Sequence, residues 1–171
     1  MATLIEHRVE AGAAFELHGV RFTPVPLLHG KLPVLGYRIE RGCGNAERAM
    51  AEAAGERESP FPLAYCTDVS GVPPESWRLL KGARTLVLDA LRHRKHPTHF
   101  TLGQAVSVAQ QVGAERTYFV HMAHDLAHEE TNAELPEGME LAYDGLVLGD
   151  GAAAKPAALQ REPAQDPDST P

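Results

Sequence analysis

Four short apolar runs in this sequence each lead directly into a histidine or an aspartate. These residues are His29, Asp68, Asp89 and His121. A single aspartate at a strand end is usually a turn former, but four such residues together favour a functional site, because loops at strand ends place side chains over a rigid sheet. Imidazole and carboxylate ligands together indicate a site for Zn²⁺, Mn²⁺ or Fe²⁺ and not a thiolate site.

Strand-like runs alternate with helical stretches, and this alternation predicts an α/β fold. The runs 86–88 and 118–120 are continuously apolar, as expected for strands that are covered on both faces. We expect the first five or six strands to be antiparallel neighbours joined by short turns. The expected strands are 15–17, 20–25, 34–40, 63–66, 85–89, 117–120, 140–142 and 146–148, and the expected helices are 73–80, 101–112 and 129–135.

The length of 171 residues fits one domain, which we expect to occupy residues 1–150. Residues 41–62 are rich in Gly, Ala, Glu and Arg, and we interpret them as an insertion, either with a surface helix at 45–54 or mobile. The tail 151–171 has few apolar residues, so we expect it to be disordered. No apolar run approaches the roughly 18 residues of a membrane span.

Charge and cysteine content narrow the class of protein further. A net charge of −7 argues against a broad nucleic-acid surface, which needs clustered Lys and Arg. A small anionic substrate is still compatible, because a metal ion supplies local positive charge. The two cysteines do not make a disulfide framework, and the N-terminus has no signal-peptide pattern. We therefore expect a soluble cytoplasmic protein.

A basic, histidine-rich segment at 92–100 lies between a predicted buried strand and a predicted helix. It includes Arg92, His96 and His99. A helix N-terminus offers free N–H groups, so this is a natural place for a phosphate. His99 directly precedes the segment's end and could act as a general acid or base, since an unperturbed histidine titrates near neutrality. The alternative interpretation is a solvated basic loop.

The spacing His-x2-His-x3-His begins at His121 and could form a metal cluster on its own. Only His121 is placed at a strand end, however. We expect His124 and Asp125 to orient a metal ligand through hydrogen bonds, and His128 to be exposed.

Several segments occur in an order that resembles a known family. They are Leu-Leu-His-Gly at 27–30, Tyr-Cys-Thr-Asp at 65–68, Leu-Asp-Ala-Leu-Arg at 88–92, His-Pro-Thr-His-Phe at 96–100, His-Met-Ala-His-Asp at 121–125 and Leu-Ala-Tyr-Asp-Gly at 141–145. Over residues 20–148 the chain resembles the phosphoribosyl cyclic phosphodiesterase branch of the metallo-β-lactamase superfamily. That branch is similar to the tRNA 3′-processing endonucleases in its metal site.

The resemblance implies an αββα sandwich and a site that hydrolyses phosphodiesters with divalent metals, Zn or Mn, two per complete site. By match to the family, His29 completes the first metal site, Asp68 bridges both metals, and His121 binds the second. His99 matches the histidine that transfers a proton near the leaving oxygen. The expected substrate is a small phosphodiester, and the residues expected to contact it or to support the ligands are Asp89, Arg92, His96, His124 and Asp125.

One part of the family pattern is missing. The signature His-x-His-x-Asp-His occurs nowhere in these 171 residues, and in the family it lies in the N-terminal half. The resemblance therefore implies half of the sandwich, a mixed sheet with flanking helices. Three hypotheses remain open: a split or truncated enzyme that needs a chain carrying the N-terminal half, a non-catalytic remnant or interaction subunit, and an enzyme that completes its metal site as a homo-oligomer.

Overall fold

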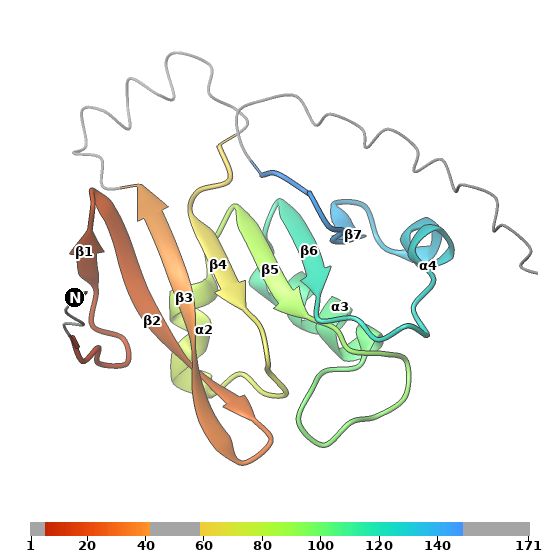
Figure 1. Ribbon diagram of the computed structural model, residues 1–171, viewed down its shortest axis with the longest axis horizontal. Helices are drawn as coiled ribbons and strands as arrows, with labels where there is room; N and C mark the ends of the chain where they lie inside the picture. The colour runs from red at the N-terminus through yellow and green to blue at the C-terminus, as the bar shows by residue number, and fades with distance from the viewer. Residues whose placement is uncertain (1–5, 42–58, 149–171) are drawn as a thin grey trace, which may run out of the picture.

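A computed structural model describes residues 6–41 and 59–148, which form a seven-stranded sheet with the strands in chain order (Figure 1). The α/β class and the mixed sheet with flanking helices are confirmed. The elements are β1 (Phe15–Leu17), β2 (Val20–His29), β3 (Leu32–Arg41), β4 (Leu63–Cys66), η1 (Pro74–Ser76), α2 (Trp77–Leu80), β5 (Thr85–Asp89), α3 (Leu102–Val112), β6 (Arg116–Val120), α4 (His128–Glu134) and β7 (Met139–Leu141).

The strand directions differ from the expectation. Strands β1 to β4 are antiparallel neighbours, but β4, β5, β6 and β7 are parallel. The prediction of five or six antiparallel strands was therefore wrong from β5 onward. Parallel neighbours need a crossover connection, and the segments with η1 and α2, with α3 and with α4 supply the three crossovers. The continuous apolar runs in β5 and β6 are typical of such strands.

Strand β2 is longer than expected because it continues through Pro24 and Pro26 to His29. Proline cannot donate a hydrogen bond and is tolerated in a strand only where its nitrogen faces away from a partner. Strand β1 pairs only with residues 20–22, so β2 has no β1 partner at either proline. The carbonyl of Pro24 instead accepts a hydrogen bond from the N–H of Gly12, on the side away from β3.

The expected strand at 146–148 is not formed. The chain turns at Tyr143 to Leu146, with Gly145 at a φ of 89°, and Val147 is 79% exposed. An apolar run without a neighbouring strand has no backbone partner, which explains the wrong prediction. The possible helix at 45–54 and the tail 151–171 lie outside the described residues, and so does most of the insertion.

Helices α2 and α3 both lie behind the sheet in Figure 1. The strand side chains that point toward them form the core with helix residues such as Leu80 and Ala105. The largest buried members are Val25, Leu27, Leu86, Leu88 and Phe119. The hydroxyl of Ser76 donates to the carbonyl of Pro26 and so ties the start of α2 to β2.

On the opposite face of the sheet, no described helix covers strands β2, β3 and β4 (Figure 1). The strand register places Phe22, Tyr37 and Tyr65 on this face, with Leu35 two positions along β3. Leu35 is 39% exposed and Tyr65 is 43% exposed. We call the side chains of Phe22, Leu35, Tyr37 and Tyr65 the open face.

In the described residues, no helix has the length and apolar character needed to cross a membrane.

The packing behind the sheet predicts that Gly36→Ala is destabilising. A Cβ at Gly36 would lie 2.7 Å from Cδ1 of Leu27 and 2.8 Å from the backbone oxygen of Tyr65, and forced overpacking costs about 1–3 kcal/mol. Gly103→Ala in α3 is the control, because its Cβ meets nothing within 4 Å; it should gain about 0.4–1 kcal/mol. Chemical denaturation measures both, and an unchanged midpoint for Gly36→Ala would contradict the β2–β3–β4 packing.

Candidate metal centre

The topology brings the four predicted strand-end residues to one edge of the sheet. Because β2 is antiparallel to β3, and β3 is antiparallel to β4, strand β2 runs in the same direction as β4, β5 and β6. The C-terminal ends of these strands therefore meet. His29 and Asp89 are the last residues of β2 and β5, Asp68 follows β4 by two residues, and His121 directly follows β6.

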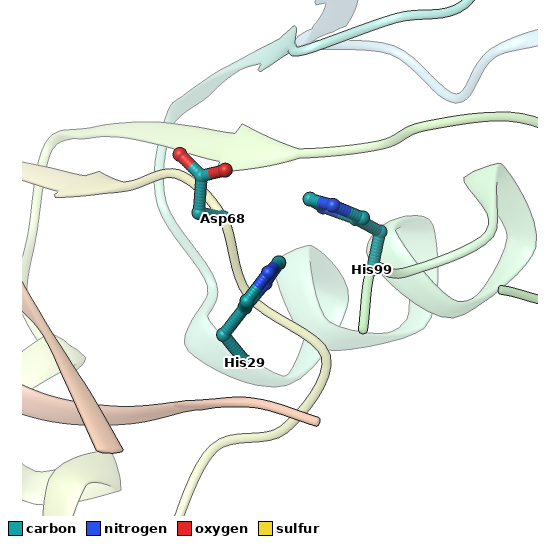
Figure 2. Close-up of side chains that lie close together, drawn as sticks. All are labelled: His29, Asp68 and His99. Atoms are coloured by element: carbon teal, nitrogen blue, oxygen red, sulfur yellow. The ribbon is translucent and has the colours of Figure 1, made fainter. Parts of the chain in front are cut away.

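Two overlapping groups of side chains at this edge have metal-binding geometry. In the first, one potential ligand atom from each of His29, Asp68 and His99 lies within 4.8 Å of the others, and the same holds for Asp89, His99 and His121. Figure 2 shows His29, Asp68 and His99 extending toward a shared space from three separate segments. The His99 ring lies between two other imidazoles, 4.6 Å from His29 and 4.7 Å from His121 between ring centroids.

Asp68 and His121 are spaced like two ligands of one ion. Nε2 of His121 lies 3.7 Å from Oδ1 of Asp68. Two tetrahedral zinc ligands, each bonded at about 2.1 Å, would be roughly 3.4 Å apart. The types and the spacing of the predicted ligands therefore fit a divalent metal. The number of protein ligands for each ion is smaller than a catalytic zinc usually has.

The backbone at Asp68 and His121 is strained. Their φ angles are 53° and 64°, in the left-handed region that favours glycine, and the only other non-glycine case in the described residues is the turn residue His18. Such conformations cost on the order of 1–3 kcal/mol each and are concentrated at functional sites. The positive φ values interrupt the extended backbone just after β4 and β6.

His29 supplies independent support for a missing binding partner. Among the buried side-chain nitrogen and oxygen atoms of the described residues, only Nδ1 of His29 has no hydrogen-bond partner. Leaving a buried polar atom unsatisfied costs about 1–3 kcal/mol. A cation bound at Nδ1 of His29 would satisfy this atom. The unsatisfied nitrogen and the types of the surrounding donors therefore both support a metal site.

Asp89 is completely buried and holds His99 in place. Its Oδ1 lies 2.9 Å from Nδ1 of His99, and its Oδ2 accepts from the N–H of Phe100 at 3.1 Å. Burial raises the pKa of Asp89, while the hydrogen bond and charge of His99 oppose that rise. With Nδ1 directed at the carboxylate, Nε2 is the nitrogen of His99 that is left to act on a ligand.

Arg92 and His96 shape the loop that carries His99. The Arg92 guanidinium donates to the carbonyls of Arg94 and Lys95, at 3.3 and 3.4 Å. The His96 ring lies 5.0 Å from the His99 ring, and its Nδ1 lies 3.2 Å from the hydroxyl of Thr98. The pKa of His96 is lowered by desolvation first, and then by the charges of His99 and Arg92.

The start of α3 offers fewer free donors than the sequence suggested. Thr101 and Gln104 form a reciprocal capping box, and the N–H of Leu102 donates to the carbonyl of Arg92. A phosphate bound by this helix terminus would have to displace these bonds. The predicted phosphate position at the helix N-terminus is therefore unfavourable, and a phosphate near this loop needs side-chain donors.

His124 and Asp125 are exposed, and within the described residues neither makes a hydrogen bond or an ion pair to the centre. Their predicted supporting role stays a prediction. His128 is exposed as expected, although its Nε2 also lies 3.1 Å from the carbonyl oxygen of Leu141.

Ser70 is a supporting residue that the sequence did not reveal. Its hydroxyl accepts from the N–H of Gly30 at 2.8 Å and donates to the carbonyl of Leu28 at 3.2 Å. It therefore fixes the backbone on both sides of His29 from the loop that carries Asp68. A serine 40 residues away from its partner leaves no local signal in a sequence.

Comparison with a family model matches most of this chain. The model described as "Beta-lactamase superfamily domain" matches residues 3–122. The match spans β1 to β6 and includes His29, Asp68, Asp89, His99 and His121.

Solved structures with this fold include a diphosphatase and a Bacillus subtilis protein. A structure titled as a new diphosphatase from the PhnP family is 44% identical, with a TM-score of 0.68, over 82% of this chain and 47% of its own. The metallo-β-lactamase-fold protein YhfI from Bacillus subtilis is 14% identical, with a TM-score of 0.57, over 78% of this chain and 51% of its own, which shows the fold alone.

A curated relative is much longer than this chain. A protein of Porphyromonas gingivalis named octanoyltransferase is 31% identical over 140 residues, which are 81% of this chain and 24% of the relative. The chain thus spans a quarter of that relative and about half of the diphosphatase. Because the matches are partial, the activities of these whole proteins are only proposals for this chain.

The Asp89–His99 pair predicts the outcome of Asp89→Asn. The N–H groups of His99 and Phe100 are bound by different oxygens of Asp89, and asparagine has an NH₂ group in place of one of them, so the variant should lose about 1–3 kcal/mol of unfolding free energy. The proton of the neutral His99 ring should move from Nδ1 to Nε2. Denaturation and ¹⁵N-edited NMR of the histidine rings measure the two effects. Glu115→Gln, whose ion pair is exposed, is the control and should change neither.

If Asp89→Asn keeps wild-type stability and the Nδ1–H tautomer, the carboxylate does not position His99.

Proposed function

This chain belongs to the beta-lactamase superfamily of metallo-β-lactamase-fold hydrolases, and we propose that its metal centre hydrolyses a small phosphodiester or diphosphate. The observation that carries the proposal is the convergence of His29, Asp68, His99 and His121 at one sheet edge, with Nδ1 of His29 unsatisfied. Imidazole and carboxylate donors in this number suit zinc or manganese.

The ligand roles are assigned by match to the family: His29 and Asp68 would hold one ion, and Asp68 and His121 would hold the other. The spacing of the donors is compatible with these roles, although it also places His99 in both groups of potential ligands. Divalent ions held there supply Lewis-acid polarisation of a phosphoryl group and lower the pKa of water. Each ion then has two protein ligands from the described residues, whereas a catalytic zinc usually has at least three.

His99 is assigned to proton transfer. Its Nδ1 is engaged with the buried carboxylate of Asp89, which leaves Nε2 as the ring nitrogen that would exchange a proton with the substrate. As water attacks phosphorus, the water would lose one proton to the solvent and the bond from phosphorus to the leaving oxygen would break. Nε2 of His99 would give that oxygen a proton and take one back from the solvent afterwards. A buried carboxylate behind a histidine is also common for metal ligands, so the role needs a direct test.

The substrate class rests on the solved relative. The diphosphatase is 44% identical across 82% of this chain, a level at which a shared reaction type is a reasonable proposal. The reaction at the scissile bond is displacement at phosphorus for a phosphodiester and for a diphosphate alike. The histidine-rich loop at 92–100, with its three basic residues, fits an anionic substrate.

We further propose that the open face binds the remainder of a diphosphatase-like domain. This occupant belongs either to the same protein or to a separate chain. Two observations support it: the ligand count is short, and the chain matches only 47% of the diphosphatase. An exposed apolar sheet face of this kind also favours association. A second copy of this chain is the competing occupant.

The alternative function is a non-catalytic interaction subunit that uses the open face without chemistry. The exposure of Leu35 and Tyr65 favours it equally, so activity decides between the two. A cytoplasmic location is part of the proposal, and it is supported by the buried Cys66 thiol, which is free within the described residues.

Metal binding gives a direct prediction. The chain should bind Zn²⁺ or Mn²⁺ weakly, because only two of its ligands reach each ion, and His29→Ala should weaken binding about tenfold or more. His7→Ala is the control, since His7 is exposed and far along the chain from the centre. Calorimetric titration measures both. If His29→Ala and His7→Ala titrate like the wild type, His29 is not a ligand.

Catalysis is predicted to need the occupant of the open face. The chain mixed with the unmatched part of the diphosphatase should form a complex that hydrolyses bis-p-nitrophenyl phosphate well above either component alone. Leu35→Asp should prevent the complex, whereas Val147→Asp, which is exposed outside the sheet, should not. In the complex, His99→Ala should slow turnover by about 10²–10⁴-fold without loss of metal.

Three results would count against this account. Strong chelator-sensitive activity from the chain alone would mean that its own residues complete the site. Loss of metal in His99→Ala would make His99 a ligand. A stable, inactive complex that Leu35→Asp disrupts would support the interaction subunit.

A further inference from the structure

At the free edge of the sheet, two side chains of α4 bind both backbone groups of one residue in β7. Strand β7 is the last in the strand order, and Figure 1 shows α4 beside it. The side-chain oxygen of Asn132 accepts from the N–H of Leu141 at 2.7 Å, and Nε2 of His128 lies 3.1 Å from the carbonyl oxygen of Leu141. We propose that His128 and Asn132 form a proton-sensitive latch, which holds α4 on the edge of β7 while His128 is neutral and releases it when His128 is protonated.

The backbone of Leu141 faces away from the rest of the sheet. The next residue, Ala142, donates its N–H to the carbonyl of Phe119 in β6 at 2.8 Å, and successive residues of a strand direct their N–H and C=O groups to opposite sides. The N–H and C=O of Leu141 therefore point outward, where an edge strand usually presents unpaired backbone groups. The latch binds both of them.

A third hydrogen bond joins the two side chains and fixes the protonation of His128. Nδ2 of Asn132 lies 3.4 Å from Nδ1 of His128. Because a carbonyl oxygen can only accept, Nε2 of His128 carries a proton and donates to Leu141. The oxygen of Asn132 is bonded to Leu141, so the NH₂ group of Asn132 faces Nδ1 of His128, which has to accept. The three bonds form a closed ring that is complete only for the neutral histidine.

A second proton on His128 breaks this ring in either orientation of the Asn132 amide. With Nδ1 protonated, Nδ1–H and the NH₂ group of Asn132 are two donors that face each other. Turning the amide over brings its oxygen to Nδ1–H, but it then places the NH₂ group opposite the N–H of Leu141. One donor lacks an acceptor in both cases, and an unmade hydrogen bond disfavours the closed latch.

No carboxylate of the described residues forms an ion pair with His128 that would compensate for the lost bond. The Tyr143 ring lies against the imidazole, with 6.0 Å between ring centroids. The acidic residues of the surrounding elements are all exposed, so water screens their charges; they are Glu129, Glu130 and Glu134 in α4, Glu140 in β7 and Asp144. The latch therefore stabilises the α4–β7 contact above the range in which an ordinary histidine titrates, about pH 6.5, and this contribution is lost as the pH falls through that range.

Opening of the latch changes what the edge of the sheet offers. The released N–H and C=O of Leu141 become an unpaired strand edge, which is the kind of surface that pairs with another chain. The pairing of β5 with β6 does not involve α4, so we expect the opening to be local.

Hydrogen exchange of the Leu141 amide in the full chain tests the latch. NMR would follow the exchange at about pH 7.5 and about pH 5, on either side of the range of an ordinary histidine, with correction for the intrinsic exchange rate. The wild type should lose about fivefold of its protection at the lower pH, which is the worth of one hydrogen bond. The amides of β5 are the internal control and should keep theirs.

Two variants separate the latch from a general effect of acid. His128→Gln has an NH₂ group for Leu141 and an oxygen for Asn132, and it does not titrate, so its protection should be the same at both pH values. Asn132→Asp places an acceptor opposite Nδ1 of His128, so its protection should rise at the lower pH. His124→Gln, which removes an exposed histidine from the loop before α4, should behave like the wild type.

Equal protection of Leu141 at both pH values in the wild type would overturn the proposal, and so would a fall in His128→Gln as large as that of the wild type. If the amides of β5 lose protection by the same factor as Leu141, the opening is global and the latch is not the acid-sensitive element. A fall in Asn132→Asp that matches the wild type would refute the ring of hydrogen bonds. Should Asn132→Asp fail to fold by circular dichroism, the comparison of the wild type with His128→Gln still decides.

Discussion

The parallel direction of β2, β4, β5 and β6 is the constraint on which the rest of the structure depends. These strands end at the same edge of the sheet, so residues separated by up to 92 positions, from His29 to His121, are brought to that edge by the strands that carry them. The helical crossovers that parallel pairing requires also place α2 and α3 on one face and bury the core there. The same arrangement leaves the open face without a described helix.

The buried Asp89 shows how the centre links folding to chemistry. A carboxylate without exposure to water is costly unless it is hydrogen-bonded, and Asp89 is bonded to both His99 and the backbone of Phe100. Those two bonds fix the entry into α3, while the bond to His99 sets which ring nitrogen faces the metal centre. Asp89 therefore both stabilises the loop and orients the ring of His99.

Much of this could be read from the sequence because it depends on local pattern. Apolar runs that end in His or Asp mark strand ends, and Thr101 as a helix N-cap marks the start of α3. The direction of the strands was predicted wrongly from β5 onward, because nothing in the local sequence distinguishes an antiparallel hairpin from a crossover that contains a short helix. Ser70 was missed for a related reason. Its partners Leu28 and Gly30 are distant in the chain, and a single serine in a loop has no periodic pattern to detect it by.

The central claim is that His29, Asp68 and His121 bind metal while His99 does not. Anomalous diffraction at the zinc edge, from crystals of the chain soaked in Zn²⁺, tests it most directly. The account predicts peaks at roughly 2.0–2.2 Å from the ligating atoms of His29, Asp68 and His121, with Nε2 of His99 outside bonding distance of either peak. A peak bonded to His99, or zinc found only at other histidines, would contradict it.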